Sequence, residues 1–196
     1  MGKERRTQAD RRTASRGAIL AAAARGIAQR GYSRLTLENV AREAGYTRGA
    51  LYHQFPGKEA LTLAVVEWIG QTWMTEVGRP LEETGDAAQV LLEVARQHAV
   101  FCRNHNAATV MQMLAIEFKH DDQALGRATA DLTEELISRC REQVLTGRRR
   151  GTIPPGPPAT DTARAYISVL EAVAVDSREP HDAVLTERAA RGVLGL

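Results

Sequence analysis

Two short apolar-faced segments joined by a glycine turn constrain the fold of this chain more than any other feature. Residues 36–58 read TLENVAREAGYTRGALYHQFPGK. Thr36 and Thr47 each precede one segment, where a threonine hydroxyl can accept a hydrogen bond from the first helical turn. Between the segments, Gly45 tolerates the left-handed backbone that a sharp turn between helices requires. The spacing therefore predicts two short helices packed against each other at an angle.

This arrangement is typical of a helix-turn-helix, in which the second helix enters the major groove of DNA while the first crosses the backbone. We expect the helices over residues 37–44 and about 48–54. Ala41 is small enough to let the helices approach, and Leu51 holds the second helix against the first. The positions expected to face inward are Leu37, Val40, Ala41, Ala44, Ala50, Leu51 and Phe55.

Charge is unevenly distributed along the chain. Residues 1–60 contain twelve Lys or Arg and five Asp or Glu, a formal balance of +7, whereas residues 61–196 contain 14 basic and 19 acidic side chains, a balance of −5. A basic segment joined to an acidic one indicates a module that binds a polyanion, attached to one that does not. A basic tail without a partner would explain residues 1–15, but not the helical pattern that follows.

Helical periodicity of apolar residues extends through the rest of the sequence, without the alternation that marks strands. The segment 151–158, GTIPPGPP, is a linker because glycine and proline interrupt helices. We therefore predict an all-α fold with about nine helices. Besides the two above, we expect a helix from about Arg16 to Gly31, a long helix from Lys58, and helices over 86–103, 107–118, 122–146, 160–176 and 181–194.

Composition excludes several other classes of protein. No window approaches the roughly 18–20 continuous apolar residues of a membrane span. The charged N-terminus lacks the apolar core of a secretory signal, so we expect a cytoplasmic protein. Cys102 and Cys140 fit no disulfide or zinc framework and are expected to be reduced core residues. Without a recognisable catalytic motif or phosphate-binding glycine loop, neither an enzyme nor a cofactor is expected.

Individual residues of the helix-turn-helix segment also match a known family. The matching positions are Thr36-Leu37, Ala41 with Ala44-Gly45, Gly49-x-Leu51-Tyr52 and Phe55-x-x-Lys58-Glu59-x-Leu61. With them, the stretch from about Ile19 to Leu61 resembles the DNA-binding region of the tetracycline-repressor (TetR, or AcrR-type) family of bacterial transcriptional regulators. The remainder of the chain suits this family by its length and helix layout only.

The resemblance implies three parts in the chain. Residues 1–15 would be a flexible basic arm, residues 16–60 a three-helix helix-turn-helix DNA-binding domain, and residues 61–196 an effector-binding and dimerisation domain. In the family, the middle helices enclose an effector pocket and the last two helices form the interface of a homodimer. Two-fold symmetry then sets both recognition helices on successive major grooves of a near-palindromic double-stranded site.

The resemblance, together with side-chain chemistry, also implies a set of DNA contacts. A guanidinium at Arg48, one residue into the second helix, can read guanine O6 and N7. Gly49 would let the backbone come close to DNA, and Lys58 would attract phosphate at the start of the next helix. Alternatively, Tyr52 is a half-buried core aromatic and Lys58 a solvated helix start. The full candidate set is Thr36, Thr47, Arg48, Gly49, Tyr52, His53 and Lys58.

Effector contacts are sought among large or polar residues on the inward faces of the middle helices. A stripe of methionine and aromatic residues at helical spacing can equally be ordinary core. The candidates are Trp68, Trp73, His98, Phe101, Met111, Met113, Leu114, Glu117 and Phe118. The dimer face is expected to use Tyr166, Ile167, Val169, Leu170, Val173, Ala174, Val184, Leu185, Ala189 and Val193.

A metal site at His98, Cys102 and His105 is an alternative for part of this region, because nitrogen and sulfur ligands at helical spacing can share a face. The sequence Asn104-His105-Asn106 is expected to end that helix, and no fourth ligand is evident. We therefore expect no metal there.

These features predict a homodimeric regulator that a small-molecule effector releases from its operator. An effector-independent or architectural DNA-binding protein is one alternative, and a DNA-acting enzyme such as a recombinase is another. Loss of DNA binding on addition of a ligand would separate the first two, and strand cleavage would support the third. Whether the regulator represses or activates depends on the position of its operator.

Overall fold

The computed structural model describes residues 8–82, 85–119, 124–176 and 182–196, which form an all-helical fold without strands. The expected fold class is therefore confirmed. The nine α-helices within these ranges are α1 (Gln8–Arg30), α2 (Leu37–Ala44), α3 (Arg48–Gln54), α4 (Lys58–Trp73), α5 (Ala87–His105), α6 (Ala107–Glu117), α7 (Ala124–Arg150), α8 (Ala159–Asp176) and α9 (Asp182–Leu194).

Two boundaries differ from the sequence-based expectation. Helix α1 begins at Gln8 rather than at about Arg16, so much of the segment expected to be a flexible arm is helical. Its glutamine, alanine and arginine residues are good helix formers, and they extend the amphipathic segment without needing a buried face. Residues 1–7 of the expected arm lie outside the described residues. Helix α7 likewise continues to Arg150.

The end of α4 is irregular. The helix continues into a π-helical turn, Met74–Gly78, and a 3₁₀ turn, Arg79–Glu82. A Cβ atom at position 78 would lie 2.8 Å from the sulfur of Met74 and 3.0 Å from the ring of Trp73. Only glycine fits there without a shift, so Gly78 lets the chain turn closely past the end of α4.

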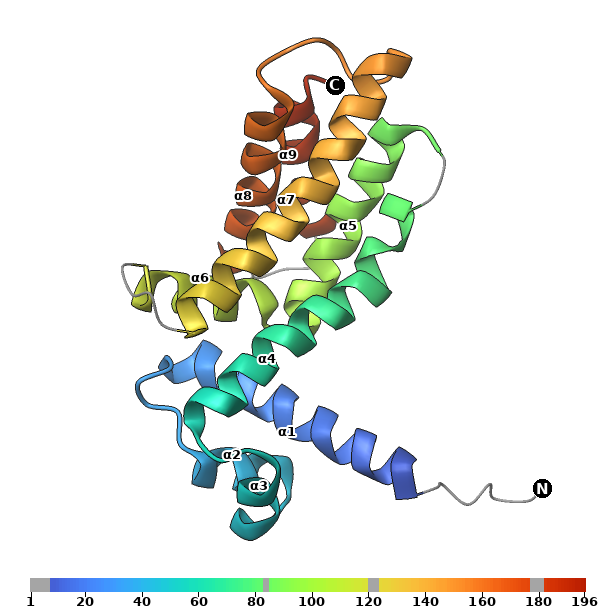
Figure 1. Cartoon of the computed structure of the whole chain (residues 1–196). Coiled ribbons are helices and arrows are strands. Elements are labelled where there is room, and N and C mark those ends of the chain that lie inside the picture. Colours follow the sequence, from blue (N-terminus) through green and yellow to red (C-terminus); the bar gives the residue numbers. More distant parts are fainter. Residues whose placement is uncertain (1–7, 83–84, 120–123, 177–181) are drawn as a thin grey trace, which may run out of the picture.

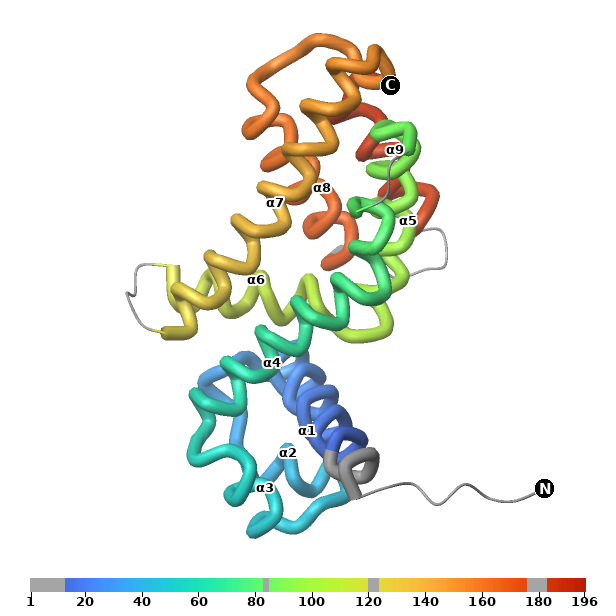
Figure 2. Tube along the Cα trace, turned by 45° about the vertical axis from the view of Figure 1, so that its right-hand side comes forward, coloured from blue at the N-terminus to red at the C-terminus, as the bar shows by residue number. Residues whose placement is uncertain are grey.

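Helices α1 to α3 and the first half of α4 form one end of the molecule (Figure 1). Helices α5, α7, α8 and α9 form the other end, and α6 lies crosswise between the two (Figures 1 and 2). Helix α4 starts beside α3 and continues up to the far bundle. It is therefore a continuous connection between the two ends. None of the described helices combines the length and apolar character needed to cross a bilayer.

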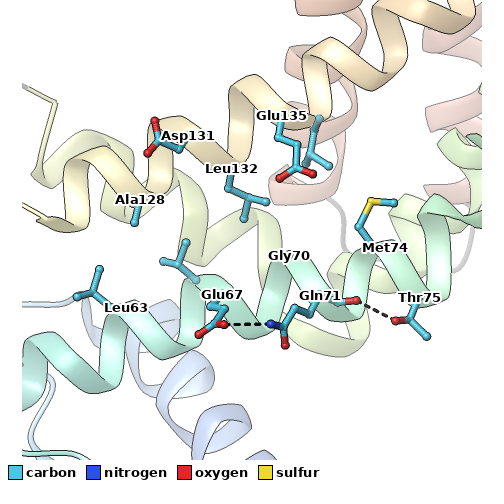
Figure 3. A pocket seen from close by; sticks show the side chains of 12 residues that line it. Leu63, Glu67, Gly70, Gln71, Met74, Thr75, Ala128, Asp131, Leu132 and Glu135 are labelled. Atoms are coloured by element: carbon cyan, nitrogen blue, oxygen red, sulfur yellow. Dashed lines mark hydrogen bonds between the residues drawn. The ribbon is translucent and has the colours of Figure 1, made fainter.

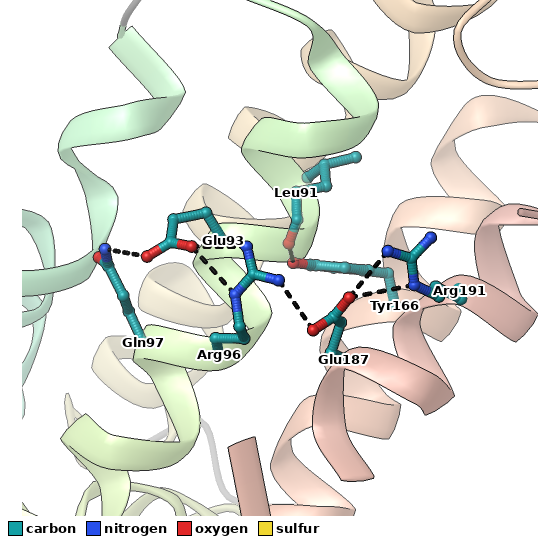
Figure 4. A network of polar contacts seen from close by, with 7 residues as sticks. All are labelled: Leu91, Glu93, Arg96, Gln97, Tyr166, Glu187 and Arg191. Atoms are coloured by element: carbon teal, nitrogen blue, oxygen red, sulfur yellow. Dashed lines mark hydrogen bonds and ion pairs between the residues drawn. The ribbon is translucent and has the colours of Figure 1, made fainter. Parts of the chain in front are cut away.

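The inner face of α8 packs into the core of its own chain. Tyr166, Ile167 and Leu170 are each at most 2% exposed, and the Tyr166 hydroxyl donates to the backbone oxygen of Leu91 at 2.5 Å (Figure 4). The expectation that these three residues lie on a dimer face is wrong, because α5 covers that side of α8 within the chain. By contrast, Val184 and Leu185 of α9 are 68% and 55% exposed.

A chain of charged groups ties α9 to α5 on the outside of this core (Figure 4). The Arg96 guanidinium donates to Glu93 at 2.7 Å and to Glu187 at 2.8 Å. Arg191 donates to the same Glu187 carboxylate at 2.8 Å. These hydrogen bonds, that from Arg96 first, lower the pKa of Glu187. Helix α9 is thereby held in register along α5.

Candidate nucleic-acid interface and ligand cavity

The turn between α2 and α3 has the geometry that its sequence predicts. The hydroxyls of Thr36 and Thr47 accept hydrogen bonds from the backbone N–H groups of Asn39 and Ala50, each at 3.2 Å. Gly45 ends α2 with φ of 76°, in the left-handed region. Both N-caps and the glycine turn are confirmed, and each of them is encoded within a few residues of sequence.

Helix α3 has one buried side and one open side. Leu51 is completely buried and Phe55 is 2% exposed, so both pack on α1 and α2 as expected. Ala50 was expected to face inward but is exposed. In so short a helix, Leu51 alone fixes the rotation, and Ala50 turns outward beside Arg48 and Gly49.

Most of the candidate DNA contacts lie on this open side. Arg48, Gly49, Tyr52 and His53 of α3 are exposed, as are the two capping threonines. Tyr52 is 45% exposed, which excludes the alternative of a core aromatic. No atom lies within 4 Å of a Cβ built on Gly49, so the backbone of α3 is accessible from outside at this point. Six of the seven candidates are thus exposed, four of them on α3 itself and one, Thr47, as its N-cap.

The Arg48 guanidinium already contacts two side chains of its own chain. Its Nη1 donates to Glu38 of α2 at 2.8 Å, and its Cζ lies 5.2 Å from the centre of the Tyr52 ring. A side-chain hydrogen bond to Tyr52, followed by the charge of Glu38, raises the pKa of Arg48. Sequence reasoning missed Glu38, although its position in the first turn of α2 puts it next to the start of α3. Any DNA contact by Arg48 must compete with this carboxylate.

Lys58 differs from the other candidates. Its ammonium donates to the backbone oxygens of Tyr32 and Ser33, each at 3.3 Å, and lies 4.1 Å from the centre of the Tyr32 ring. It joins the start of α4 to the turn after α1, so it is neither a free phosphate ligand nor a solvated helix start. Tyr32 also packs edge-to-face on Phe118, with ring centres 5.1 Å apart, and this contact links this end of the molecule to the end of α6.

Comparison with known proteins agrees with this geometry. Residues 19–65 match the family described as bacterial regulatory proteins, tetR family. Over these residues the chain matches the TetR family. Among characterised relatives, it is 36% identical over 101 residues to the HTH-type transcriptional regulator CymR of Pseudomonas putida. That match covers 50% of this chain and 49% of CymR, so the chain spans about half the length of the curated relatives it matches.

Solved structures resemble this chain over most of its length. A structure of AibR in complex with isovaleryl coenzyme A and operator DNA has a TM-score of 0.72 at 19% identity, covering 92% of this chain and 96% of AibR. FadR from Bacillus subtilis in complex with stearoyl-CoA has a TM-score of 0.75 at 17% identity, covering 91% of this chain and 97% of FadR. At such identities the likeness establishes a common fold.

The far end of the chain holds a small, partly enclosed cavity of about 20 Å³ between α4, α5, α6, α7 and α8, referred to below as the enclosed cavity. Four of the expected ligand residues line it, namely Trp73, His98, Phe101 and Met111. Sequence reasoning missed Cys102, Leu132, Thr133 and Glu171, which also line it. Of these, Glu171 has its pKa raised by burial. Its place on α8, far along the chain, gave no signal in the sequence.

The other ligand candidates do not reach this cavity. Leu114 is buried in the general core, and Glu117 is exposed at the end of α6. Phe118 packs on Tyr32 instead. Trp68 lies against the His105 ring, with ring centres 5.5 Å apart. Met113, half-buried on α6, is not among the lining residues either.

A buried chain of polar contacts forms one wall of the cavity. The Trp73 indole Nε1 donates to His98 Nδ1 at 3.0 Å, and His98 Nε2 lies 3.3 Å from the Cys102 sulfur. Because Nδ1 accepts, the proton of neutral His98 belongs on Nε2. Burial lowers the pKa of His98 to about 4 and raises the pKa of Cys102 to about 12.

His105 does not join His98 and Cys102 as a third metal ligand. Its Nε2 faces Glu76 at 3.1 Å, outside the cavity. Within the described parts of the chain, no group of three or more histidine, cysteine or acidic side chains is arranged to hold a metal ion.

Substituting His98 tests this buried contact through pH. The folded chain keeps His98 neutral down to about pH 4, whereas the unfolded chain protonates it near pH 6.5. The stability that neutral His98 contributes above pH 6.5 is therefore lost as the pH falls toward 4, by about 1.4 kcal/mol per pH unit. His98→Gln keeps an acceptor for Trp73 but cannot titrate. We expect its free energy of unfolding to fall less steeply over this range.

Urea unfolding of both proteins at several pH values measures this slope. The raised pKa of Glu171 acts in the opposite sense but is common to both proteins, so the difference between them isolates His98. Parallel curves for His98→Gln and the wild type would contradict a neutral buried His98.

Proposed function

We propose that this chain is a homodimeric DNA-binding transcriptional regulator whose affinity for its operator is changed by a small-molecule effector. The observation that carries the proposal is the open face of α3, where a capped helix presents Arg48 beside an accessible backbone at Gly49. In this proposal, residues 16–60 bind DNA, and residues 61–196 bind the effector and dimerise. Of the basic arm expected over residues 1–15, the part from Gln8 onward belongs to α1.

Each residue of the open face has a role that suits its chemistry. Arg48 is assigned to a guanine edge in the major groove, after it leaves Glu38. Tyr52 and His53, one turn further along α3, are assigned to phosphate contacts. Thr36 and Thr47 retain hydroxyl protons for phosphate oxygens, because their oxygens already cap the helices. Lys58 is assigned a positioning role, since its ammonium holds the turn after α1.

Dimerisation is proposed through the outer faces of α8 and α9. Val184 and Leu185 are large apolar side chains left exposed on α9, and half-buried Val169 and Val173 continue the apolar surface on α8. A two-fold axis through this surface would pair two copies of α3 with a near-palindromic double-stranded site. Such a role belongs in the bacterial cytoplasm, with the chromosome, and it requires no catalytic step.

Effector control is supported by the fold and by relatives that share it. AibR was solved with isovaleryl coenzyme A and operator DNA, and FadR with stearoyl-CoA. Here α4 continues from the side of α3 to the enclosed cavity, so a ligand that repositions α4 can change the separation of the two DNA-binding ends. Its effect on DNA binding is limited to the difference between its affinities for the two conformers. We propose release from the operator, and thus repression in its absence.

The test is binding of the full chain to the DNA directly upstream of its own gene, by fluorescence anisotropy at two salt concentrations. Arg48→Ala should weaken binding roughly ten- to a hundredfold, the worth of one good base contact. Glu38→Gln is the matched variant, because it frees Arg48 and removes a carboxylate near the phosphates. We expect it to bind at least as tightly as the wild type.

Two outcomes would contradict this function. Weak binding that ignores both sequence and Arg48 would favour an architectural DNA-binding protein. Equal losses in Arg48→Ala and Glu38→Gln would mean that the pair only stabilises the fold, and that Arg48 does not contact a base.

A further inference from the structure

A second and much larger hollow lies between α4 and α7, outside the enclosed cavity. It has a volume of about 640 Å³, within the range of pockets that hold small organic ligands. Figure 3 shows the two helices facing each other across it, with Leu63 and Gly70 on α4, Met74 in the π-helical turn that continues α4, and Ala128 and Leu132 on α7. The hollow is an open groove with a mainly apolar floor.

The charged groups of this groove all have one sign. Glu67, Asp131 and Glu135 line it, and no lysine, arginine or histidine is found among the described residues that do so. Glu67 accepts a hydrogen bond from Gln71 at 3.0 Å, and Glu135 is paired with Arg139 at its edge at 2.8 Å. Asp131 has no hydrogen-bond or ion-pair partner in the described part of the chain. The groove therefore favours a positive group and disfavours phosphate.

Leu132 separates the groove from the enclosed cavity. Gly70, Leu132 and Leu136 line both spaces. A Cβ atom at position 70 would lie 2.8 Å from Cδ1 of Leu132, so the leucine side chain occupies the room that the missing side chain of Gly70 leaves. The half-buried Leu132 side chain thus stands in the wall that the groove shares with the space beside Trp73 and His98.

We propose that the effector is an elongated amphiphile with a cationic head and an apolar tail. The head lies near Asp131 and Glu67, and the tail passes Leu132 toward Trp73. This proposal rests on the proposed function and names the class of ligand for it. An acyl-coenzyme A ester, which AibR and FadR were solved with, brings several phosphates to a groove that carries only carboxylates. Such an ester should bind poorly here.

Binding in this groove reaches the DNA-binding end through α4. The groove is lined from Leu63 to Thr75, and α4 begins at Lys58, which is fastened to the turn after α1. A tail that separates α4 from α7 therefore moves a helix whose start lies next to α3. The same ligand that fills the groove should lower the affinity for operator DNA.

The first experiment compares three ten-carbon probes on the full chain by titration calorimetry, below their micelle concentrations. We expect decyltrimethylammonium to bind at least about tenfold more tightly than decanoate, because like charges in one site oppose binding. Decanoyl-coenzyme A should bind no better than decanoate. Equal affinity for the cation and the anion, or preference for decanoyl-coenzyme A, would overturn the assignment of a cationic head.

Matched variants test the carboxylates. Asp131→Asn should weaken decyltrimethylammonium binding by about two- to fivefold, the usual range for one exposed charge pair. Adding Glu67→Gln should deepen the loss, while binding of uncharged 1-decanol stays the same in all variants. Glu59→Gln, which removes an exposed carboxylate of α4 outside the groove, is the control and should change nothing. Equal effects at positions 59 and 131 would indicate long-range charge only, and would refute the site.

Tryptophan fluorescence tests the path past Leu132. The sequence contains two tryptophans, so Trp68→Phe leaves Trp73 as the only one. A decyltrimethylammonium analogue with bromine at the tail end should quench Trp73 if the tail passes Leu132, because bromine quenches only at short range. Binding without quenching would refute the path. If no cation binds but operator binding still depends on Arg48, the effector class is wrong and the proposed function stands.

Discussion

Leu51→Ala is expected to lower the free energy of unfolding by about 2–5 kcal/mol, the range for a leucine removed from a closed core. Leu51 is completely buried, and it is the one residue within α3 whose side chain is buried. The seven-residue helix has little stability of its own, since isolated helices shorter than about 12–15 residues are marginal in water. We therefore expect α3 to lose its orientation first.

Urea unfolding followed by circular dichroism measures this loss, and operator binding at low temperature measures its consequence. Specific binding should fall more than for Arg48→Ala, while salt-dependent non-specific binding persists. Ala50→Ser, at the exposed neighbouring position, is the control and should stay within about 0.5 kcal/mol of the wild type. A loss below about 1 kcal/mol for Leu51→Ala would show that α3 is held by other contacts.

The helix-turn-helix could be predicted from the sequence because its determinants are local. Thr36, Gly45 and Thr47 act within a few residues of their own position, through caps and a left-handed turn. What local reasoning missed was contact between elements. The Glu38–Arg48 pair joins two helices, and the role of Lys58 depends on where the chain after α1 passes. Neither follows from periodicity.

The far end, from α4 to α9, was predicted as a set of helices but only partly as a site. Trp73, His98, Phe101 and Met111 do meet at one cavity, because each is large and faces inward on its helix. Glu171, which lines the same cavity, comes from α8, and the groove residues Asp131 and Glu135 of α7 were not among the candidates. Which faces of α4, α7 and α8 meet is decided by tertiary packing. The same reason explains why Tyr166 and Leu170, expected on a dimer face, are buried under α5.

Trp73→Ala is expected to have the largest effect at the far end of the molecule, a loss of about 3–5 kcal/mol in the free energy of unfolding. The indole is 2% exposed, closes the end of α4, and donates to His98 Nδ1 at 3.0 Å. Removing it leaves a void next to the enclosed cavity and an imidazole nitrogen without its donor. Trp73→Phe keeps most of the ring but not the N–H, so its loss should be clearly smaller.

Rescue by a small aromatic molecule distinguishes a void from a general collapse. If the core around His98 and Phe101 holds its shape in Trp73→Ala, added indole should refill the space and raise the melting temperature of the variant, with no effect on the wild type. Benzene should rescue less, because it has no N–H for His98. Equal rescue by both molecules would mean that the hydrogen bond to His98 adds little. No rescue by either would mean that α4 and α5 close over the gap, in which case the cavity owes its shape to Trp73 itself.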